Sequence, residues 1–351
     1  MVRAWADADR LSRPPLLVLE PLQRYLDDGE HGAGELHVAL LAGGHSNATF
    51  VLRRDAWTAV LRRPPRPPIP PGAHDVVREG RLLRGLSATD VPVPAVLDIC
   101  ESPEVIGAPF VLMELIDGAV VEQSVPKQLD SPDERRRLGE AFVDALVAVH
   151  DVDVEAAGWE WAGRRGGYLE RQLRRFAGGW EANKTRELPA MEELERRLRA
   201  AVPASQEITL VHGDYRLGNA LVATEAPAHI VALLDWEMGT IGDPLADLGY
   251  LCATWTDRRD ERRPSFHLSP VTAAPGFPTR DELVGRYELR SGRSAADLQW
   301  YWGLAAWKSA VFMEGNYRRA LAGMSDDPWA LEFRDGVEEL AEIGLAALTG
   351  R

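Results

Sequence analysis

The segment that decides the fold is Val211–Asn219, VHGDYRLGN, together with LLDWE at Leu233–Glu237. Each segment begins in a short run of β-type residues and continues into polar residues. Asp214 and Asn219 are thus a carboxylate and a carboxamide five residues apart on one polar loop, and Asp235 is a second carboxylate at the exit of the next strand. Polar side chains that emerge together from buried strand ends are costly unless they are satisfied, so such places are often functional.

Oxygen ligands of this kind suit Mg²⁺, which takes one or two carboxylates and leaves its other positions to waters and substrate phosphates. Phosphoryl transfer needs such a metal, a cation on the nucleotide phosphates, and a carboxylate that orients the attacking hydroxyl and accepts its proton. The pattern therefore favours a nucleotide-dependent phosphotransferase. Simpler roles are also open: Asp214 and Asp235 can be turn or capping residues, and Glu237, Asp243 and Asp247 can be loop-ordering groups.

These motifs resemble those of a known family. Asp-x-x-x-x-Asn followed by Asp is the loop pattern of the protein-kinase-like superfamily, and the leading His212-Gly213 resembles the aminoglycoside phosphotransferase family. Gly43–Asn47 resembles that family's nucleotide loop, GTIGDPLADL at Gly239–Leu248 the segment after the catalytic loop, and YELRSGR at Tyr287–Arg293 its substrate region. Within the family, the chain is most similar to the kinase-like domain associated with some acyl-CoA dehydrogenases.

The resemblance implies an α+β, protein-kinase-like fold with two lobes, and the hydrophobic pattern agrees with it. We expect residues 1–116 to form an N-terminal nucleotide-binding lobe, an antiparallel sheet with one main helix at His74–Leu86. We expect residues 117–351 to form a larger, mainly helical catalytic and substrate lobe. Strands are expected in the first lobe at residues 36–40, 49–52, 58–62, 95–100 and 110–114. Helices are expected in the second lobe at residues 133–150, 169–180, 191–202, 298–321 and 333–348.

The resemblance also implies a role for each site residue. Asp214 would be the catalytic base, while Asn219 and Asp235 would hold Mg²⁺. Arg62 would contact the α- and β-phosphates of ATP and pair with Glu79 on the following helix. The other nucleotide-binding positions would lie in the glycine loop and on the strand that joins the lobes, where backbone groups would meet adenine: Gly43, Gly44, His45, Ser46, Asn47, Met113, Glu114 and Leu115. An aspartate matching Asp247 would brace the catalytic loop.

Arginine at position 62 is the main departure from the family, which usually has lysine there. The chain holds only three lysines against 37 arginines, and the first of them is Lys127. A guanidinium stays charged and can grip phosphate with two hydrogen bonds, but its planar fork is larger than an ammonium. Arg63 is a competing candidate, and strand alternation turns Arg62 and Arg63 to opposite faces.

Composition narrows the function classes. The chain has 351 residues, of which 45% are hydrophobic and 27% charged, so it is not a wholly disordered protein. Its net charge of −14 argues against a protein that grips nucleic acid. The two distant cysteines, Cys100 and Cys252, make neither a metal clip nor a disulfide framework. No uncharged apolar run is long enough for a bilayer, and the first ten residues lack a signal peptide's apolar region, so we expect a cytoplasmic protein with no membrane partner.

Together these features predict a small-molecule kinase that uses ATP and Mg²⁺ to phosphorylate a hydroxylated small molecule. The resemblance to the dehydrogenase-associated branch implies a hydroxyacyl thioester or another non-antibiotic acceptor rather than an aminoglycoside, and the apolar and aromatic residues of 298–321 suit an apolar acceptor better than a sugar. Arg62 raises one alternative, a nucleotide-binding regulatory module without transferase activity. Hydrolysis by a Ser–His–Asp set is disfavoured, because the chain has no G-x-S-x-G segment.

Overall fold

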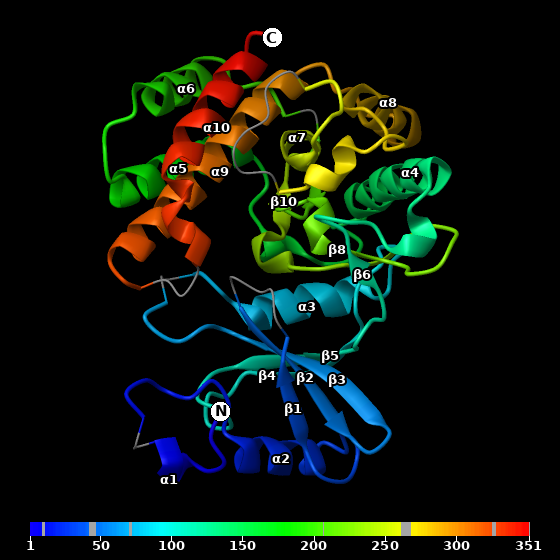
Figure 1. Cartoon of the computed structure of the whole chain (residues 1–351), viewed down its shortest axis with the longest axis vertical. Helices are drawn as coiled ribbons and strands as arrows, with labels where there is room; N and C mark the ends of the chain where they lie inside the picture. The colour runs from blue at the N-terminus through cyan, green and yellow to red at the C-terminus, as the bar shows by residue number, and fades with distance from the viewer. Residues whose placement is uncertain are drawn as a thin grey trace. The chain divides into compact units, whose positions relative to one another are not determined.

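The computed structural model divides the chain into two compact units (Figure 1). Unit 1 comprises Met1–Asp117 and Leu234–Glu237, and unit 2 comprises Gly118–Leu233 and Met238–Arg351. The structure describes residues 1–8, 11–41, 47–69, 72–205, 207–260, 268–324 and 328–350. The short segment Leu234–Glu237 thus belongs by its contacts to the first unit, although it follows a strand of the second.

Unit 1 is built on a five-stranded antiparallel sheet with the strand order β1-β2-β3-β5-β4. Its strands are β1 (His37–Leu40), β2 (Ala48–Arg54), β3 (Trp57–Arg63), β4 (Val96–Cys100) and β5 (Phe110–Met113). Arg54 pairs with Trp57, so a two-residue turn joins β2 to β3. Asp55 in this turn has a positive φ of 39°, a conformation that aspartate tolerates better than most residues.

Two helices cover opposite faces of this sheet (Figure 1). α2 (Leu19–Asp28) packs on the face that carries Phe110, in one apolar core. α3 (Val76–Leu86) crosses the other face so closely that a Cβ atom at Gly80 would lie 2.7 Å from the Val111 side chain. Because neighbouring strand residues point to opposite faces, β5 is buried on both sides. A further short helix, α1 (Trp5–Ala8), precedes α2.

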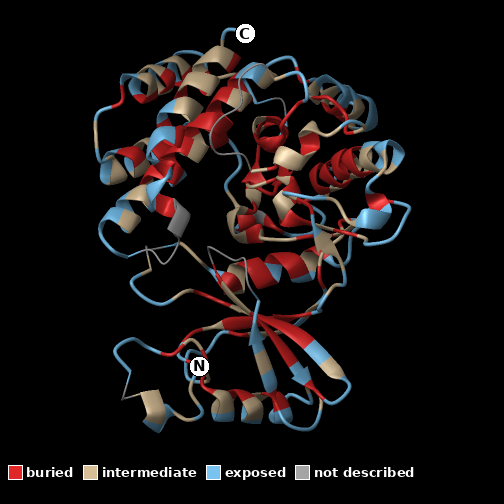
Figure 2. Cartoon of the chain, in the orientation of Figure 1, coloured by how far each residue is buried: buried red, intermediate tan, exposed pale blue. Residues whose placement is uncertain are grey.

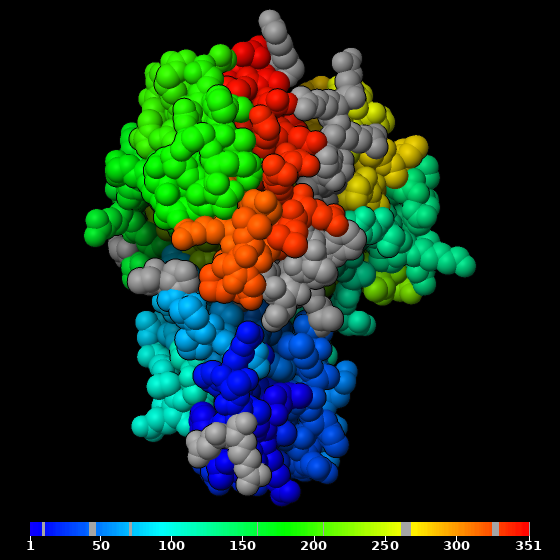
Figure 3. All heavy atoms as spheres, turned by 60° about the vertical axis from the view of Figure 1, so that its left-hand side comes forward, coloured from blue at the N-terminus to red at the C-terminus, as the bar shows by residue number. Residues whose placement is uncertain are grey.

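Unit 2 is mainly helical. Its helices are α4 (Pro132–His150), α5 (Tyr168–Asn183), α6 (Pro189–Ala200), α7 (Leu245–Thr254), α8 (Arg280–Ser291), α9 (Leu298–Leu321) and α10 (Phe333–Ala347). α9 packs against α5, α6, α7 and α10, and Figure 3 shows the surfaces of α5 and α6 beside those of α9 and α10. Figure 2 shows that α7 is buried along most of its length. None of the helices in the described ranges is long and apolar enough to cross a bilayer.

Short strands of unit 2 carry the polar loop singled out in the sequence. β7 (Thr209–Val211) pairs with β10 (Thr240–Gly242), and β8 (Ala220–Val222) pairs with both β6 (Ala119–Val120) and β9 (Ile230–Leu233). The polar loop therefore runs from one small sheet to another, and all of these pairings are antiparallel. Since β9 ends two residues before Asp235, the loop after β7 and the exit of β9 both follow paired strands.

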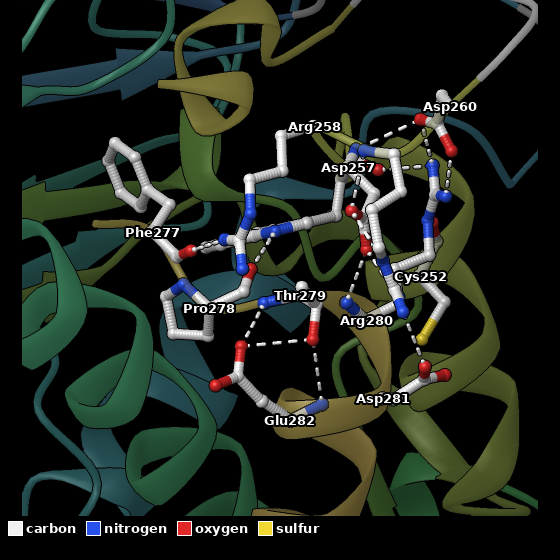
Figure 4. A network of polar contacts seen from close by, with 12 residues as sticks. Cys252, Asp257, Arg258, Asp260, Phe277, Pro278, Thr279, Arg280, Asp281 and Glu282 are labelled. Atoms are coloured by element: carbon white, nitrogen blue, oxygen red, sulfur yellow. Dashed lines mark hydrogen bonds and ion pairs between the residues drawn. The ribbon is translucent and has the colours of Figure 1, made fainter. Parts of the chain in front are cut away.

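A polar network joins the end of α7 to the start of α8 (Figure 4). The buried Asp257 carboxylate accepts hydrogen bonds from the backbone N–H groups of Arg280 (2.8 Å) and Arg259 (3.0 Å). The Arg280 side chain donates to the Cys252 carbonyl (2.8 Å) and lies 4.7 Å from the centre of the Trp302 ring. Burial would raise the pKa of Asp257, but the bonds from Arg259 and Arg280 lower it to about 2. The carboxylate therefore stays charged and holds the two helices in register.

Candidate active site

Gly213 fixes the geometry of the loop between β7 and β8. Its φ is +81°, a left-handed conformation that favours glycine. A Cβ atom there would lie 2.7 Å from the Met238 carbonyl oxygen, so any side chain would force the backbone apart. The His-Gly-Asp sequence thus has a steric reason at its middle position, next to Asp214.

Asp247 of α7 stabilises the same loop through hydrogen bonds to its backbone. Its carboxylate is fully buried and accepts hydrogen bonds from the backbone N–H groups of His212 (2.6 Å) and Gly213 (2.8 Å). His150 lies 3.4 Å from one carboxylate oxygen. Burial would raise the pKa of Asp247, but the His150 contact and the backbone donors lower it overall. This charged brace is the role that the sequence analysis expected for Asp247.

Asp214 is held by four groups of unit 2. The Asn219 side-chain nitrogen donates to the Asp214 carboxylate (2.7 Å) and to its backbone carbonyl (2.9 Å). Arg216 Nε lies 3.8 Å from the same carboxylate. Burial would raise the pKa of Asp214, but the charges of Lys308 and Arg216 and a hydrogen bond from Tyr250 lower it overall. Asp214 is therefore an ionised carboxylate at neutral pH, the state that a general base requires.

We call Asp214, Arg216, Asn219 and Lys308 the Asp214 cluster. The sequence analysis placed Asp214 and Asn219 together, and the structure brings them into hydrogen-bond contact. It did not include Lys308, which α9 brings to the Gly213 carbonyl. One signal could have found it: a single lysine inside the long apolar run 298–321, in a chain with only three lysines.

Arg62 and Glu79 form an ion pair inside unit 1. Arg62 Nε donates to the buried Glu79 carboxylate at 2.9 Å, as the sequence analysis expected. Arg62 also pairs with Asp235, and Glu79 accepts a hydrogen bond from the backbone N–H of Trp236 (3.1 Å). Burial by itself would lower the pKa of Arg62, but the charges of Glu79 and Asp235 raise it above its usual value. The guanidinium therefore remains positive.

Arg63 faces the other way and is part of the core of unit 1. Its guanidinium is 3% exposed and donates to the backbone carbonyls of Pro64 (2.9 Å), Ile106 (3.3 Å) and Leu16. Burial lowers the pKa of Arg63 to about 10, with a smaller contribution from the charge of Arg66. Among the described residues Arg62 pairs with carboxylates whereas Arg63 bonds to backbone carbonyls, so strand alternation gives the two arginines different surroundings.

The carboxylates around Arg62 outnumber it. We call Arg62, Glu79, Asp235 and Glu237 the Arg62 cluster. Burial raises the pKa of Glu79 to about 7, since Arg62 opposes this shift while the charges of Asp235 and Glu237 add to it. Arg62 thus pairs with two of these carboxylates, Glu79 and Asp235, and the third, Glu237, adds negative charge nearby. The excess of negative charge in this cluster favours the binding of a cation.

Asn47 extends this cluster toward the glycine loop. Its side chain is 2% exposed and its amide nitrogen donates to Glu237 (3.4 Å), while His74 Nδ1 lies 3.5 Å from the same carboxylate. The Asn47 side-chain oxygen is buried and has no hydrogen-bond partner among the described residues. Glu237 therefore binds two neighbouring side chains, which agrees with the loop-ordering role that the sequence analysis left open for it.

The remaining predicted nucleotide residues give less information. Gly43, Gly44, His45 and Ser46 lie outside the described residues. Met113 ends β5 and is buried, whereas Leu115 is 37% exposed. The backbone N–H of Glu114 donates to the Ala95 carbonyl (2.8 Å), so it is already used within unit 1. Contact with adenine would fall to other backbone groups of this short segment.

The predicted metal ligands all offer oxygen. Asp235 is a carboxylate with a positive φ of 63°, two residues after the end of β9, and Asn219 is 6% exposed. Because the Asn219 nitrogen is bonded to Asp214, its side-chain oxygen is the atom left for a cation. Within the described ranges, no group of three or more His, Cys, Asp or Glu side chains is arranged as a metal centre. The ligand types still fit Mg²⁺, which prefers oxygen and keeps several waters.

Sequence comparison assigns the chain to a family. A model of the phosphotransferase enzyme family known as APH matches residues 37–268, most of the chain. This protein belongs to that family. The match includes both the Asp214 loop and Arg62, so the resemblance seen in the motifs is confirmed.

Curated relatives confirm the branch as well. Acyl-CoA dehydrogenase family member 10 of Mus musculus is 34% identical over 92% of this chain and 30% of its own length. Acyl-CoA dehydrogenase family member 11 of Homo sapiens is 31% identical over 92% of this chain and 42% of its own length. The chain thus spans 30% and 42% of the lengths of these two relatives, less than half of each.

Solved structures confirm the fold class. A candidate aminoglycoside phosphotransferase from Ralstonia eutropha is 31% identical, with a TM-score of 0.80, 95% of this chain covered and 99% of the other. A thermostable mutant of an aminoglycoside phosphotransferase, in ternary complex with AMP-PNP and hygromycin B, is 16% identical with a TM-score of 0.61, covering 95% of this chain and 100% of the other. The second likeness concerns the fold alone. The α+β kinase-like fold predicted from the sequence is therefore correct.

Proposed function

We propose that this chain is a small-molecule kinase that transfers the γ-phosphoryl group of ATP to a hydroxyl group of a small molecule. The observation that carries the proposal is the state of Asp214, a carboxylate kept ionised by neighbouring cations and held in place by Asn219. Membership of the phosphotransferase family supports it. In this reaction Asp214 orients the acceptor hydroxyl and takes its proton as the oxygen attacks phosphorus.

Asn219 and Asp235 would hold Mg²⁺. Asn219 directly precedes Ala220, and Ala220 pairs with Leu233, two residues before Asp235. The antiparallel pairing thus leads the chain to both residues at one end of the same ladder. When bound, Mg²⁺ neutralises charge on the transferring phosphates. The surplus of carboxylate in the Arg62 cluster supports a cation beside Asp235.

Arg62 would bind the nucleotide phosphates, and Glu79 would orient it. The guanidinium is charged, and its Nε is held by Glu79, so its remaining N–H groups can face phosphate. Under this proposal residues 1–116 are the nucleotide-binding lobe and residues 117–351 the catalytic and substrate lobe. The glycine loop 43–47 and residues 113–115 would complete the ATP site.

The acceptor is proposed to be a hydroxyacyl thioester or another non-antibiotic alcohol. The relatives named as acyl-CoA dehydrogenase family members support the first class. Lys308 and Arg216 lie beside Asp214 and would repel a polycation such as an aminoglycoside. The half-exposed Phe312 ring on α9, near Lys308, suits an acceptor with an apolar part.

Mass spectrometry on an acceptor panel tests the function. The chain would be incubated with ATP and Mg²⁺ and with hydroxyacyl thioesters, free hydroxy acids, sugars and aminoglycosides, beside the Asp214→Asn variant. We expect a product heavier by one phosphate from a non-antibiotic acceptor, and almost none from the variant. Efficient phosphorylation of aminoglycosides alone would overturn the proposed acceptor.

A nucleotide-binding module without transferase activity is the second candidate, favoured by Arg62 in place of the usual lysine. Its signature would be thermal stabilisation by Mg·ATP with no ATP turnover and no phosphorylated product from any acceptor. ATP turnover that depends on Asp214 would exclude it.

A further inference from the structure

Lys308 is a charged residue at the centre of an apolar helix. It lies on α9 between Trp307, which is fully buried, and Ala310, which is buried as well. Placing an ammonium among such neighbours is costly unless it has partners. The chain has only two other lysines, Lys127 and Lys184, and Lys127 is exposed at the surface.

Its partners come from the catalytic loop and from three aromatic rings. Lys308 Nζ donates to the backbone carbonyl of Gly213. The same nitrogen lies 4.6 Å from the centre of the Tyr250 ring and 5.9 Å from the centres of the Phe176 and Phe312 rings. Aromatic rings at this distance attract a cation. The three rings therefore stabilise the ammonium group, and the Gly213 carbonyl accepts its hydrogen bond.

Both backbone polar groups of Gly213 are consequently hydrogen-bonded to charged side chains. Its N–H donates to Asp247 of α7 (2.8 Å), and its carbonyl accepts from Lys308 of α9. The positive φ of Gly213 makes this peptide the point at which the loop turns toward Asp214. A charged side chain on each side of the turn would keep it from rotating.

The charges around Lys308 favour its ammonium form despite burial. Burial lowers the pKa of Lys308 overall, Asp214 and Asp247 oppose this, and Arg175 adds to it. The Tyr250 hydroxyl also belongs to this group, through its hydrogen bond to Asp214. Asp214 contributes the largest stabilising charge to the Lys308 ammonium, so the two side chains are electrostatic partners.

We propose that Lys308 is a positioning residue of the catalytic loop, which holds the Gly213 carbonyl and places a positive charge beside the Asp214 carboxylate. The assignment of a catalytic benefit rests on the proposed role of Asp214 as the base. The physical pairing of Lys308 with the loop does not rest on that role. The two parts are therefore tested separately.

The pairing is tested by NMR, because a chain with three lysines gives three ¹³Cε signals after lysine labelling. We expect the Lys308 signal, assigned with Lys308→Arg, to titrate at lower pH than that of Lys184, because burial lowers the pKa of Lys308 whereas Glu181 and Glu187 raise the pKa of Lys184. In Asp214→Asn the Lys308 signal should titrate at still lower pH, because the negative charge that raises the pKa of Lys308 is gone. A Lys308 signal that titrates with the other two, unchanged in Asp214→Asn, would overturn the proposal.

The catalytic benefit is tested with ATP turnover of full-length variants. Lys308→Met should lower kcat by about 10²-fold, the cost of a misplaced catalytic group, with the KM for ATP unchanged. Lys308→Arg should recover part of the loss, since it restores the charge and a donor. Lys184→Met is the matched control and should behave as wild type, because Lys184 pairs with Glu181 and Glu187 at the surface.

The outcomes separate the two claims. Equal loss in Lys308→Met and Lys308→Arg, with a raised KM for ATP, would mean that Lys308 only supports the fold. If the NMR shift appears but Asp214→Asn keeps full turnover, the pairing is upheld and the role of Asp214 as base is wrong. If wild type shows no turnover at all, the NMR result alone decides on the pairing.

Discussion

The Asp214 cluster and the Arg62 cluster treat their carboxylates in opposite ways. In the first, Lys308 and Arg216 lower the pKa of Asp214 against the effect of burial. In the second, burial together with neighbouring carboxylates raises the pKa of Glu79 to about 7 although Arg62 touches it. In the Asp214 cluster the positive charges of Lys308 and Arg216 balance the carboxylate and keep Asp214 ionised. The second has more negative than positive groups, as expected of a place that receives a cation.

The largest effect is expected from a substitution in the Asp214 cluster. Asp214→Asn keeps the size of the side chain but removes the proton acceptor, so turnover should fall by about 10²–10⁴-fold. Binding of Mg·ATP should change little, since the Arg62 cluster is untouched. Rates from a coupled ATP assay and affinity from calorimetry check both statements. A variant with near-wild-type turnover would remove Asp214 from the mechanism.

Asp235→Ala tests whether the Arg62 cluster receives a cation. It removes a proposed metal ligand and one partner of Arg62, so affinity for Mg·ATP should fall by more than about 10²-fold, given that even outer-shell partners of metal ligands are worth about 10–100-fold. Calorimetric titration with and without Mg²⁺ measures the loss. The exposed Asp28→Ala on α2 is the matched control. Unchanged affinity in Asp235→Ala would contradict a cation site at this carboxylate.

Arg62→Met and Arg63→Met sharpen the distinction between a site arginine and a structural one. Arg62→Met should weaken ATP binding by about 10–100-fold, since hydrogen bonds to charged groups are worth about 1.5–3 kcal/mol. Arg63→Met leaves buried carbonyls such as Pro64 O without a donor and should lower the free energy of unfolding by about 2–4 kcal/mol. Calorimetry and urea unfolding check the pair. The reverse pattern would exchange their roles.

The smallest expected effect is a pH dependence of stability caused by Glu79. Its pKa is raised from 4.5 to about 7 in the folded chain, so the folded state holds a proton that the unfolded state has released. Between these values the free energy of unfolding should fall with rising pH, by about 1–3 kcal/mol more in wild type than in Glu79→Gln. Urea unfolding of both proteins at about pH 4.5, 6 and 7.5 measures this pH dependence of the free energy of unfolding. Parallel pH curves would show that Arg62 fully compensates the carboxylate.

Much of the fold could be predicted from sequence because its signals are local. The apolar spacing of residues 133–150 and 298–321 matches α4 and α9 within a residue, and Ser131 caps the start of α4 by accepting a hydrogen bond from the Glu134 N–H (3.2 Å). The strands of unit 1 were likewise found within one or two residues. The pairing partners of β7 and β9 were not predicted, because pairing depends on contacts between distant segments.

The site was predictable only where its members are close in sequence. Asp214 and Asn219 share one loop, and their contact follows from their spacing. Lys308 reaches the same loop from 95 residues away along the chain, through the packing of α9; its place in an apolar run marks the residue in the sequence but does not identify its partner. The placement of Arg63 in the core was visible only as an alternation, and its backbone partners were not.

The central claim is that the chain moves phosphate from ATP to an alcohol with Asp214 as the base. Phosphorus-31 NMR of the chain with Mg·ATP and the acceptor panel follows that transfer directly. We predict that the γ-phosphate signal decays while a phosphomonoester signal grows with wild type, and that Asp214→Asn yields almost none. A folded wild-type chain that binds ATP and forms no phosphomonoester, or an Asp214→Asn variant that forms it equally fast, would contradict the claim.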